Sequence, residues 1–571
     1  MPFRRRRAVL FIMLVFLMAI SYVSIKNSYI TKRLSYLNYP TKKLIAERSP
    51  LSMSKYAHQN VAKDNVRVLQ SGEYQPIKNL TTNGWVFKNP KLINATTNES
   101  VDVVLSKNPN NREEYIMGVL SRWSVQDSLY SEISIFLINF TERGEIYINS
   151  TEFNVSVSYL GGFTVTGTTG NYLRITAFDL VWKNATTVAV VYIKQYVSQK
   201  QYVSEQTYVD TYNISTRSLN IVTGVWTSEE NIVSDVIGVG YDVSIFRWGN
   251  TDEATILWIG TRVVYYWGTV SAVRYEGQFI RESGKVANIS FGKLNVSKAT
   301  PESAYISNIV WDPWGHDVCV VISLVSSIGS ALASLIWDGV VTSVSAEPII
   351  ATSDLDDYDL PLLDFKDPSI APINNFSDFI VSFIGYSDYD SYVMYFRGEF
   401  LGDSIGAPDD IVLENQLRSS SKTLLIDNNY LDNKSILAWI DRTGAAVVKA
   451  MIIEYNYSEQ VFNKSEITTY ANISDVVDFD ALFMGSLNIT MVVNSTYSPE
   501  TEANNSILLA FAADVNGSRY PYVAYGLKDS DHDYLGDCEE TFYSGDYRIS
   551  DTDDDRILDG SEVFVYKTGV N

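Results

Sequence analysis

Cysteine and histidine are both scarce in this chain. Only Cys319 and Cys538 occur among its 571 residues, and two distant cysteines do not form a disulfide framework. Cys319 lies within a short apolar run, which predicts a buried thiol in a β-strand. The three histidines, His58, His316 and His532, argue against an all-histidine zinc site and against most Ser–His–Asp arrangements.

Positive charge is also in short supply. The chain has 45 lysines and arginines against 67 aspartates and glutamates, a net charge of −22. A polyanion of this kind is repelled by nucleic-acid phosphates, so we expect no nucleic-acid partner. Hydrophobic residues make up 46% and charged residues 20%, which excludes a largely disordered chain. At about 150 residues per domain, the length suggests three to four units.

The first 25 residues predict export. Arg4–Arg7 precede the uncharged segment Ala8–Ile25, whose 18 residues are at the short end of what spans a bilayer. The arginines orient the segment with its N-terminus in the cytoplasm and everything after it outside. We favour an uncleaved membrane anchor. The alternatives are a secretory signal cut after Ser21 and a pilin-type signal cut near Arg7, and all three export the remaining chain.

Residues 26–65 differ in composition from the rest of the chain. Between residues 26 and 63 there are eight basic residues and the single acid Glu47, which indicates a basic linker between the membrane and the body. Attraction to anionic lipid head groups is an alternative role. The chain also contains nineteen Asn-x-Ser/Thr sequons, so an exported glycoprotein is the economical interpretation.

Residues 66–526 have the rhythm of β-structure. Short runs of alternating apolar and polar residues, rich in valine, isoleucine, tyrosine and threonine, are separated by glycine, asparagine, aspartate and serine. No stretch after the N-terminus has a sustained helical period. The body is therefore predicted to be mainly β.

A pair of similar segments suggests an internal repeat. Asp179–Trp182 and Asn308–Trp311 each end in tryptophan, and each is followed, after a polar turn, by a very apolar strand. Weaker copies surround five further aromatic residues: Trp123, Trp248, Phe383, Trp439 and Phe483. Seven units at this spacing predict a β-propeller of about seven blades. Tandem β-sandwich domains are the alternative architecture.

Residues 527–571 form an acidic tail with regularly spaced carboxylates. In two twelve-residue loops that begin 22 residues apart, acids occupy positions 1, 3, 5, 9 and 12, and position 7 offers a backbone carbonyl. The first loop comprises Asp529, Asp531, Asp533, Leu535, Asp537 and Glu540. The second comprises Asp551, Asp553, Asp555, Ile557, Asp559 and Glu562. Calcium requires six to eight oxygen ligands converging from a tight loop, so this spacing predicts two Ca²⁺ sites.

The two loops resemble the EF-hand-type calcium loops of thrombospondin type 3 repeats, which occur on secreted and cell-surface proteins. The resemblance covers about 45 of the 571 residues. It implies calcium-dependent stability and a place outside the cell. The family usually has glycine at position 6, where this chain has Tyr534 and Arg556. A left-handed backbone costs a non-glycine residue about 1–2 kcal/mol, so weak sites or a relaxed geometry are expected.

The search for catalytic motifs gives little. Gly402–Gly406 matches a nucleophile-elbow pattern, but the elbow requires a strand leading into a helix, and we interpret the match as a chance turn. The acidic clusters Asp354–Asp357 and Ser387–Asp390 are typical of solvated turns, although a propeller hydrolase could use such acids in pairs.

The sequence therefore favours a membrane-tethered surface glycoprotein that binds, adheres to or assembles with a protein or glycan partner, with no catalytic residue assigned. A secreted hydrolase acting on polysaccharide or peptide, and an ectodomain that captures solutes, are the alternatives.

Overall fold

The computed structural model describes residues 43–46 and, with short gaps, residues 85–563. The chain divides into two units, Met1–Ile45 and Ala46–Asn571. The predicted anchor (1–25) and nearly all of the basic linker (26–65) lie outside the described residues, which include only strand β1 (Lys43–Ala46) of that region. No helix in the described part of the chain is both long and apolar enough to cross a membrane.

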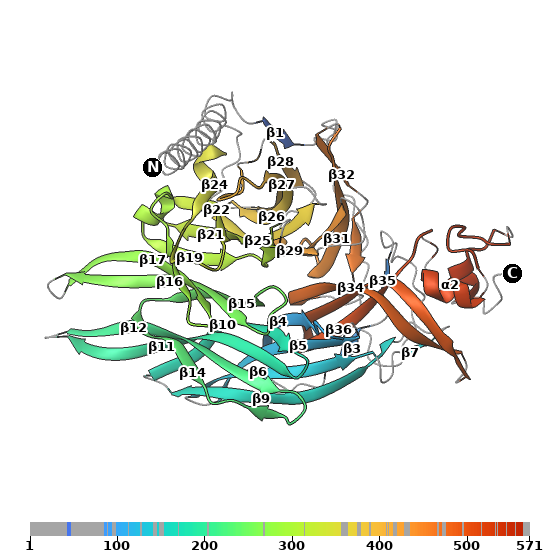
Figure 1. Cartoon of the computed structure of the whole chain (residues 1–571), viewed down its shortest axis with the longest axis horizontal. Coiled ribbons are helices and arrows are strands. Elements are labelled where there is room, and N and C mark those ends of the chain that lie inside the picture. The colour runs from blue at the N-terminus through green and yellow to red at the C-terminus, as the bar shows by residue number, and fades with distance from the viewer. Residues whose placement is uncertain are drawn as a thin grey trace, which may run out of the picture. The chain divides into compact units, whose positions relative to one another are not determined.

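Residues 85–528 form a seven-bladed β-propeller, as predicted, in which the main strands of each blade pair antiparallel (Figure 1). Blade 1 contains β4 (Glu99–Lys107), β5 (Glu114–Val125), β6 (Ser128–Asn139) and β9 (Ser156–Thr168). Blade 2 contains β10 (Asn171–Asn184), β11 (Thr187–Tyr202), β12 (Glu205–Asn220), β13 (Val225–Trp226) and β14 (Glu230–Ile237). Blades 1 and 2 share one hydrogen-bonded sheet, joined where Thr168 pairs with Asn171.

The next three blades repeat the arrangement. Blade 3 contains β15 (Gly240–Arg247), β16 (Ala254–Tyr266), β17 (Thr269–Arg281), β18 (Val286–Ser290) and the parallel β23 (Ser343–Ser345). Blade 4 contains β19 (Pro301–Ile306), β20 (Val310–Trp311), β21 (Val318–Ser326), β22 (Gly329–Trp337) and β24 (Glu347–Ala351). Blade 5 contains β25 (Asp364–Ile373), β26 (Asp378–Tyr386), β27 (Ser391–Glu399) and β28 (Asp410–Glu414). Two 3₁₀ helices, η1 (Asn295–Lys298) and η2 (Thr352–Asp354), lie in connections.

Blade 7 combines strands from both ends of the described chain. Blade 6 contains β29 (Ser420–Ile426), β30 (Lys434–Asp441), β31 (Val447–Asn456), β32 (Val461–Lys464) and β33 (Thr468–Tyr470). Blade 7 contains β34 (Val476–Val493), β35 (Thr496–Val515), β36 (Ser518–Lys528) and, from the N-terminal side, β2 (Trp85–Phe87) and β3 (Lys91–Leu92). Two short strands of the blade 1 segment, β7 (Glu145–Tyr147) and β8 (Phe153–Asn154), extend its sheet beside β34. Because β2 and β3 pair with β36, the N-terminal strands close the ring.

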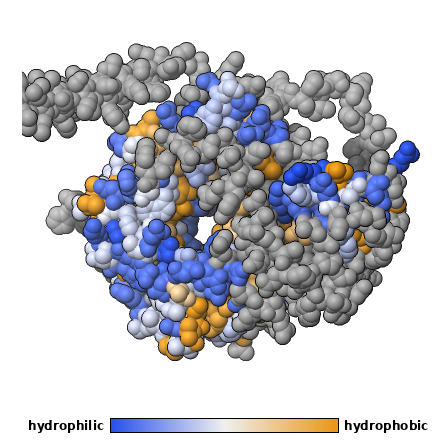
Figure 2. Space-filling view, turned by 45° about the vertical axis from the view of Figure 1, so that its right-hand side comes forward, coloured by the Kyte–Doolittle hydropathy of each residue, from blue (hydrophilic) through white to orange (hydrophobic). Residues whose placement is uncertain are grey.

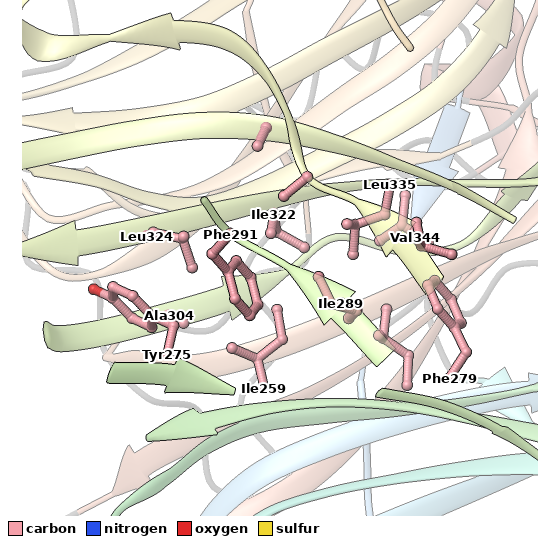
Figure 3. Packing of buried hydrophobic residues seen from close by; sticks show 14 of the residues in the cluster. Ile259, Tyr275, Phe279, Ile289, Phe291, Ala304, Ile322, Leu324, Leu335 and Val344 are labelled. Carbon is pink, nitrogen blue, oxygen red and sulfur yellow. The ribbon is translucent and has the colours of Figure 1, made fainter. Parts of the chain in front are cut away.

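Apolar side chains fill the spaces between neighbouring blades. All nine residues of β21 are buried, as expected for a strand covered on both faces. Between blades 3 and 4, Ile259, Phe279 and Ile289 face Ile322 and Leu335 (Figure 3). Cys319 is buried within β21 as predicted, and neither it nor Cys538 forms a disulfide.

The tryptophans that suggested the repeat occupy equivalent places. Trp182 of β10 pairs with Val188 near the start of β11, with Asn184 and Thr187 as the last pair before the turn, and Trp311 ends β20 opposite Val318, the first residue of β21. Both tryptophans therefore lie opposite the start of the second strand of their blade, as predicted. The weaker copies are not equivalent: Trp123, Phe383 and Trp439 lie on the second strands β5, β26 and β30, Phe483 lies on the first strand β34, and Trp248 directly follows the first strand β15.

A kink recurs on the innermost strand of every blade. Each of these strands has a register shift in its first half against the second strand, which is the mark of an extra residue in a β-bulge. The shifts lie between Ser100 and Asp102, Ile175 and Ala177, Gly240 and Asp242, Pro301 and Ser303, Lys366 and Ser369, Ser421 and Thr423, and Val476 and Asp478. The bulge is therefore a more regular marker of the blade repeat than any aromatic residue.

Candidate metal centre in the C-terminal tail

The first acidic loop begins directly after the last propeller strand. β36 ends at Lys528, and side-chain oxygens of Asp529, Asp531 and Asp533 lie within 4.8 Å of one another. The Leu535 N–H donates to Asp533 Oδ1 at 2.8 Å, which turns the chain towards helix α2 (Asp537–Tyr543). The carboxylates at positions 1, 3 and 5 of the first loop therefore converge.

A second group of carboxylates joins the two loops. Side-chain oxygens of Asp533, Glu540 and Asp559 also lie within 4.8 Å of one another, and all three residues are buried. The Gly560 N–H donates to Asp533 Oδ2 at 2.7 Å. Asp559 was expected to serve the second loop, but it lies beside the closing glutamate of the first.

In both loops, the aspartate at position 9 accepts hydrogen bonds from the residue at position 2. In the first loop, Ser530 donates its N–H and its Oγ–H to the Asp537 carboxylate at 2.7 and 2.8 Å. In the second, Thr552 donates in the same way to Asp559 at 2.8 and 2.6 Å. Asp537 also forms an ion pair with Lys528 at 3.3 Å. It belongs to neither of the two groups of three carboxylates, so these contacts shape the first loop.

Glu540 places a buried carboxyl group at the site without a hydrogen bond. Both of its carboxyl oxygens are buried, and within the described part of the chain no hydrogen-bond donor reaches them. Burial, reinforced by Asp531, Asp533, Asp537 and Asp529, raises the pKa of Glu540 to about 10. Burial likewise raises the pKa of Asp533 to about 7. A bound cation would reverse both effects by stabilising the ionised carboxylates.

The second loop is described in part. Arg556 at position 6 has a left-handed backbone (φ 77°), and its N–H donates to Asp551 Oδ2 at 2.7 Å. Position 6 thus adopts the conformation for which related loops use glycine. Among the described residues, the remaining acids of this loop, Asp551, Asp553 and Glu562, form no group of three, while Asp555 and Tyr534 lie outside the described residues.

The tail is also anchored by apolar contacts. Leu535, Cys538 and Val563 are buried in a cluster with Tyr525 and Leu527 of β36. The sequence pattern assigned only a backbone carbonyl to Leu535, yet its side chain is part of the hydrophobic core. The short helix α3 (Asp559–Ser561) precedes Val563 and brings it into the cluster.

The propeller axis carries a different set of acids, which the sequence analysis did not single out. Figure 2 shows the molecule hollowed near its centre, with hydrophilic residues along part of the rim. On the innermost strands, Asp179 Oδ2 accepts from the Ile245 N–H at 2.8 Å, Asp242 Oδ2 from the Ile306 N–H at 2.8 Å, and Asp480 Oδ2 from the Leu105 N–H at 2.7 Å. These carboxylates fasten β10 to β15, β15 to β19 and β34 to β4.

The motifs considered for catalysis lie in turns. Gly402–Gly406 follows β27 as a turn, where Ser404 Oγ donates to its neighbour Asp403 at 3.3 Å. Asp354 accepts from the Ala351 N–H at 2.9 Å beside η2, and the Asp390 N–H donates to Ser387 Oγ at 3.0 Å. The remainder of both acidic clusters lies outside the described residues.

No known protein family model matches the sequence, and no curated protein is similar to it. The solved structures that match the chain include NanB sialidase from Streptococcus pneumoniae, with TM-score 0.38 and 7% identity over 77% of this chain and 70% of that one. They also include the Nup133 β-propeller domain from Vanderwaltozyma polyspora (TM-score 0.35, 9% identity, 77% and 98% covered) and the polysaccharide lyase Uly1 (0.34, 7%, 78% and 98%). Similarity at this level carries no functional argument for this chain.

Proposed function

We propose that the C-terminal loops bind calcium and that the chain is an exported, membrane-tethered β-propeller glycoprotein, which binds or assembles with a protein or glycan partner at the cell surface. The observation that carries this proposal is the pair of buried Glu540 oxygens without a hydrogen-bond donor in the described structure. Leaving a buried carboxylate unpaired is costly, and a cation offsets that cost.

The donor chemistry favours calcium over softer metals. Every grouped ligand is a carboxylate, supplied by Asp529, Asp531, Asp533, Glu540 and Asp559. Hard cations prefer oxygen donors, and calcium accepts irregular sets of six to eight ligands. Millimolar calcium outside the cell would fill a site with a dissociation constant of about 10⁻⁴ M.

The N-terminal sequence supports an extracellular location. Arg4–Arg7 before the apolar segment Ala8–Ile25 orient the body outwards, and the nineteen sequons fit a glycosylated surface protein. An uncleaved segment would tether the propeller to the membrane.

The innermost strands support a role in binding rather than hydrolysis. The carboxylates of Asp179, Asp242 and Asp480 accept hydrogen bonds from backbone N–H groups of neighbouring strands, which is a structural use of half-buried carboxylates. Within the described residues, Gly402–Gly406, Asp354, Ser387 and Asp390 contribute to turns.

The proposal is tested by protease treatment of intact cells that express the full chain. External protease should remove the propeller, and a calcium chelator should speed cleavage between residues 529 and 562. Glu540→Gln should make the tail sensitive even with calcium present, whereas Glu230→Gln, on an exposed residue of β14, should behave as wild type. A propeller fully protected from external protease would refute the location, and cleavage indifferent to calcium would refute the metal site.

A further inference from the structure

The ring of blades has one seam where its two ends meet. At this seam, β2 and β3 complete blade 7 by pairing with β36, with Trp85 opposite Lys528 and Lys91 opposite Val523. The Ile93 N–H donates to the Pro521 carbonyl at 2.9 Å. Lys91 Nζ donates to the Val155 carbonyl, at the start of β9, at 2.8 Å, so the N-terminal strands also fasten blade 7 to blade 1.

The seam is filled by one apolar cluster to which three parts of the chain contribute. Ile93 comes from the N-terminal side, Tyr115 and Phe140 come from blade 1, and Tyr525 comes from blade 7. The Phe140 and Tyr525 rings lie 5.3 Å apart. The third contribution comes from the tail, in three residues: Leu535, Cys538 and Val563.

The acidic site and the seam are directly connected. Lys528, the last residue of β36, pairs with β2 and immediately precedes Asp529. Leu535 and Cys538 lie between the ligands Asp533 and Glu540, so the same loop carries both carboxylates and seam contacts. An added Cβ at Gly536 would lie 2.9 Å from Leu527 Cβ, which shows how closely the loop lies on β36.

We infer that calcium at the C-terminal site acts as a clamp on the seam of the propeller, and this inference rests on the proposed calcium binding. Without a cation, the carboxyl groups of Asp531, Asp533 and Glu540 are crowded together in the site with no counter-charge, and Glu540 is left buried and unpaired, which favours release of the loop that carries them. Release withdraws Leu535 and Cys538 from the seam and frees the edge of β36 on which β2 is paired. The ring is then held closed by fewer contacts, and calcium outside the cell restores them.

The inference is tested by hydrogen exchange with mass spectrometry on the full chain in detergent, with calcium chloride or with a chelator. Calcium at about 1 mM and a dissociation constant of about 10⁻⁴ M should slow opening by a factor of about ten, since binding to the closed form alone scales its population by 1 + [Ca²⁺]/Kd. The slowing should appear in residues 85–93 and 526–528. The buried strand β21 in blade 4 should exchange equally in both conditions.

Two variants separate the clamp from calcium binding itself, which calorimetry measures on the same samples. Glu540→Gln should abolish the effect of calcium at the seam, while Glu230→Gln should retain it. Leu535→Ala should still bind calcium but should lose most of the slowing, because the apolar link is removed. Calcium binding with unchanged exchange at residues 85–93 would overturn the clamp and leave the proposed function intact. An absence of calcium binding would overturn both.

Discussion

Glu540 and Asp559 belong to different acidic loops, yet their carboxylate oxygens lie within 4.8 Å of each other and share Asp533 as a neighbour. The Gly560 N–H, which donates to Asp533, holds the second loop against the first. The two loops are consequently one unit, and removal of a charge from the second loop should be felt at the first.

Asp559→Asn should weaken calcium binding by about 10–100-fold, the range found when groups that support metal ligands are altered. Asparagine still accepts a hydrogen bond from Thr552, so the loop keeps most of its shape. Asp551→Asn is the matched control, because Asp551 lies outside both carboxylate groups. Calorimetry on the full chain measures both. Equal effects of the two substitutions on the tightest site would contradict the shared arrangement.

Gly560→Ala should disrupt the contact between the loops. A Cβ at this position would clash with the carbonyl oxygen of Asp533, which is backbone and cannot swing aside. We expect a loss of about 1–3 kcal/mol in the stability of the docked tail, with weaker calcium binding. Gly444→Ala is the control, since a Cβ there meets nothing within 4 Å. Calcium-dependent protease resistance of the tail is the measurement, and equal resistance in both variants would contradict the prediction.

One aromatic residue per blade was enough to predict the propeller. The sequence did not predict where within each blade that residue lies. Trp182 and Trp311 both lie opposite the start of the second strand of their blade, close to a turn, whereas Trp439 lies on the second strand itself. The bulges recur more regularly, but Tyr241 and Lys422 occupy the extra position in different blades and share no side-chain chemistry. A backbone feature that tolerates any side chain leaves no mark in a single sequence.

The acidic spacing predicted the convergence of Asp529, Asp531 and Asp533, because a fixed short loop determines which carboxylates meet. The contact between Asp559 and Glu540 depends instead on how one loop packs on the other, which spacing within a loop does not determine. Leu535 illustrates the same limit. Its position in the loop predicted a backbone carbonyl ligand for calcium, whereas the packing of the tail on β36 also places its side chain in the hydrophobic core.

Asp179→Ala should destabilise the propeller by about 1–3 kcal/mol, because it leaves the buried Ile245 N–H without its acceptor. Ser244 Oγ, 2.7 Å from Asp179, loses its partner as well. Asp252→Ala, on an exposed residue in the same region of blade 3, should change stability very little. Thermal unfolding at saturating calcium compares the two, and similar melting temperatures for both variants would show that the carboxylate does not fasten the strands.

The stability of the propeller should rise as the pH is lowered from about 8 to about 5.5. Burial raises the pKa of Asp242 to about 7 and those of Asp179 and Asp480 to about 6. The pKa values of these aspartates in the folded state exceed the pKa of aspartate in the unfolded chain. The folded state therefore binds more protons between about pH 5.5 and 8, and stability is lost as the pH rises through the folded-state pKa values. The neighbouring charges, Asp367 and Lys422, modify the values without reversing the direction.

At lower pH the trend should reverse. Burial opposes ionisation of Glu253, but its hydrogen bond with Arg281 outweighs this and lowers the pKa to about 2. A carboxylate whose pKa is lowered in the folded state stabilises the protein at pH values above the pKa that it has in the unfolded chain. That contribution is lost as the pH falls towards 2. Melting temperatures across the range at constant calcium should therefore pass through a maximum on the acidic side of neutrality. A steady fall in melting temperature from pH 8 downwards would contradict the assignment.

Calorimetric titration of the purified full chain with calcium chloride tests the central claim most directly. The buried, unpaired oxygens of Glu540 predict binding of at least one calcium ion per chain, with a dissociation constant of about 10⁻⁴–10⁻³ M or tighter, and loss of that binding in Glu540→Gln but not in Glu230→Gln. The account would be contradicted if no binding heat were measured at calcium concentrations up to about ten times the higher of these two dissociation constants and the circular dichroism spectrum did not change.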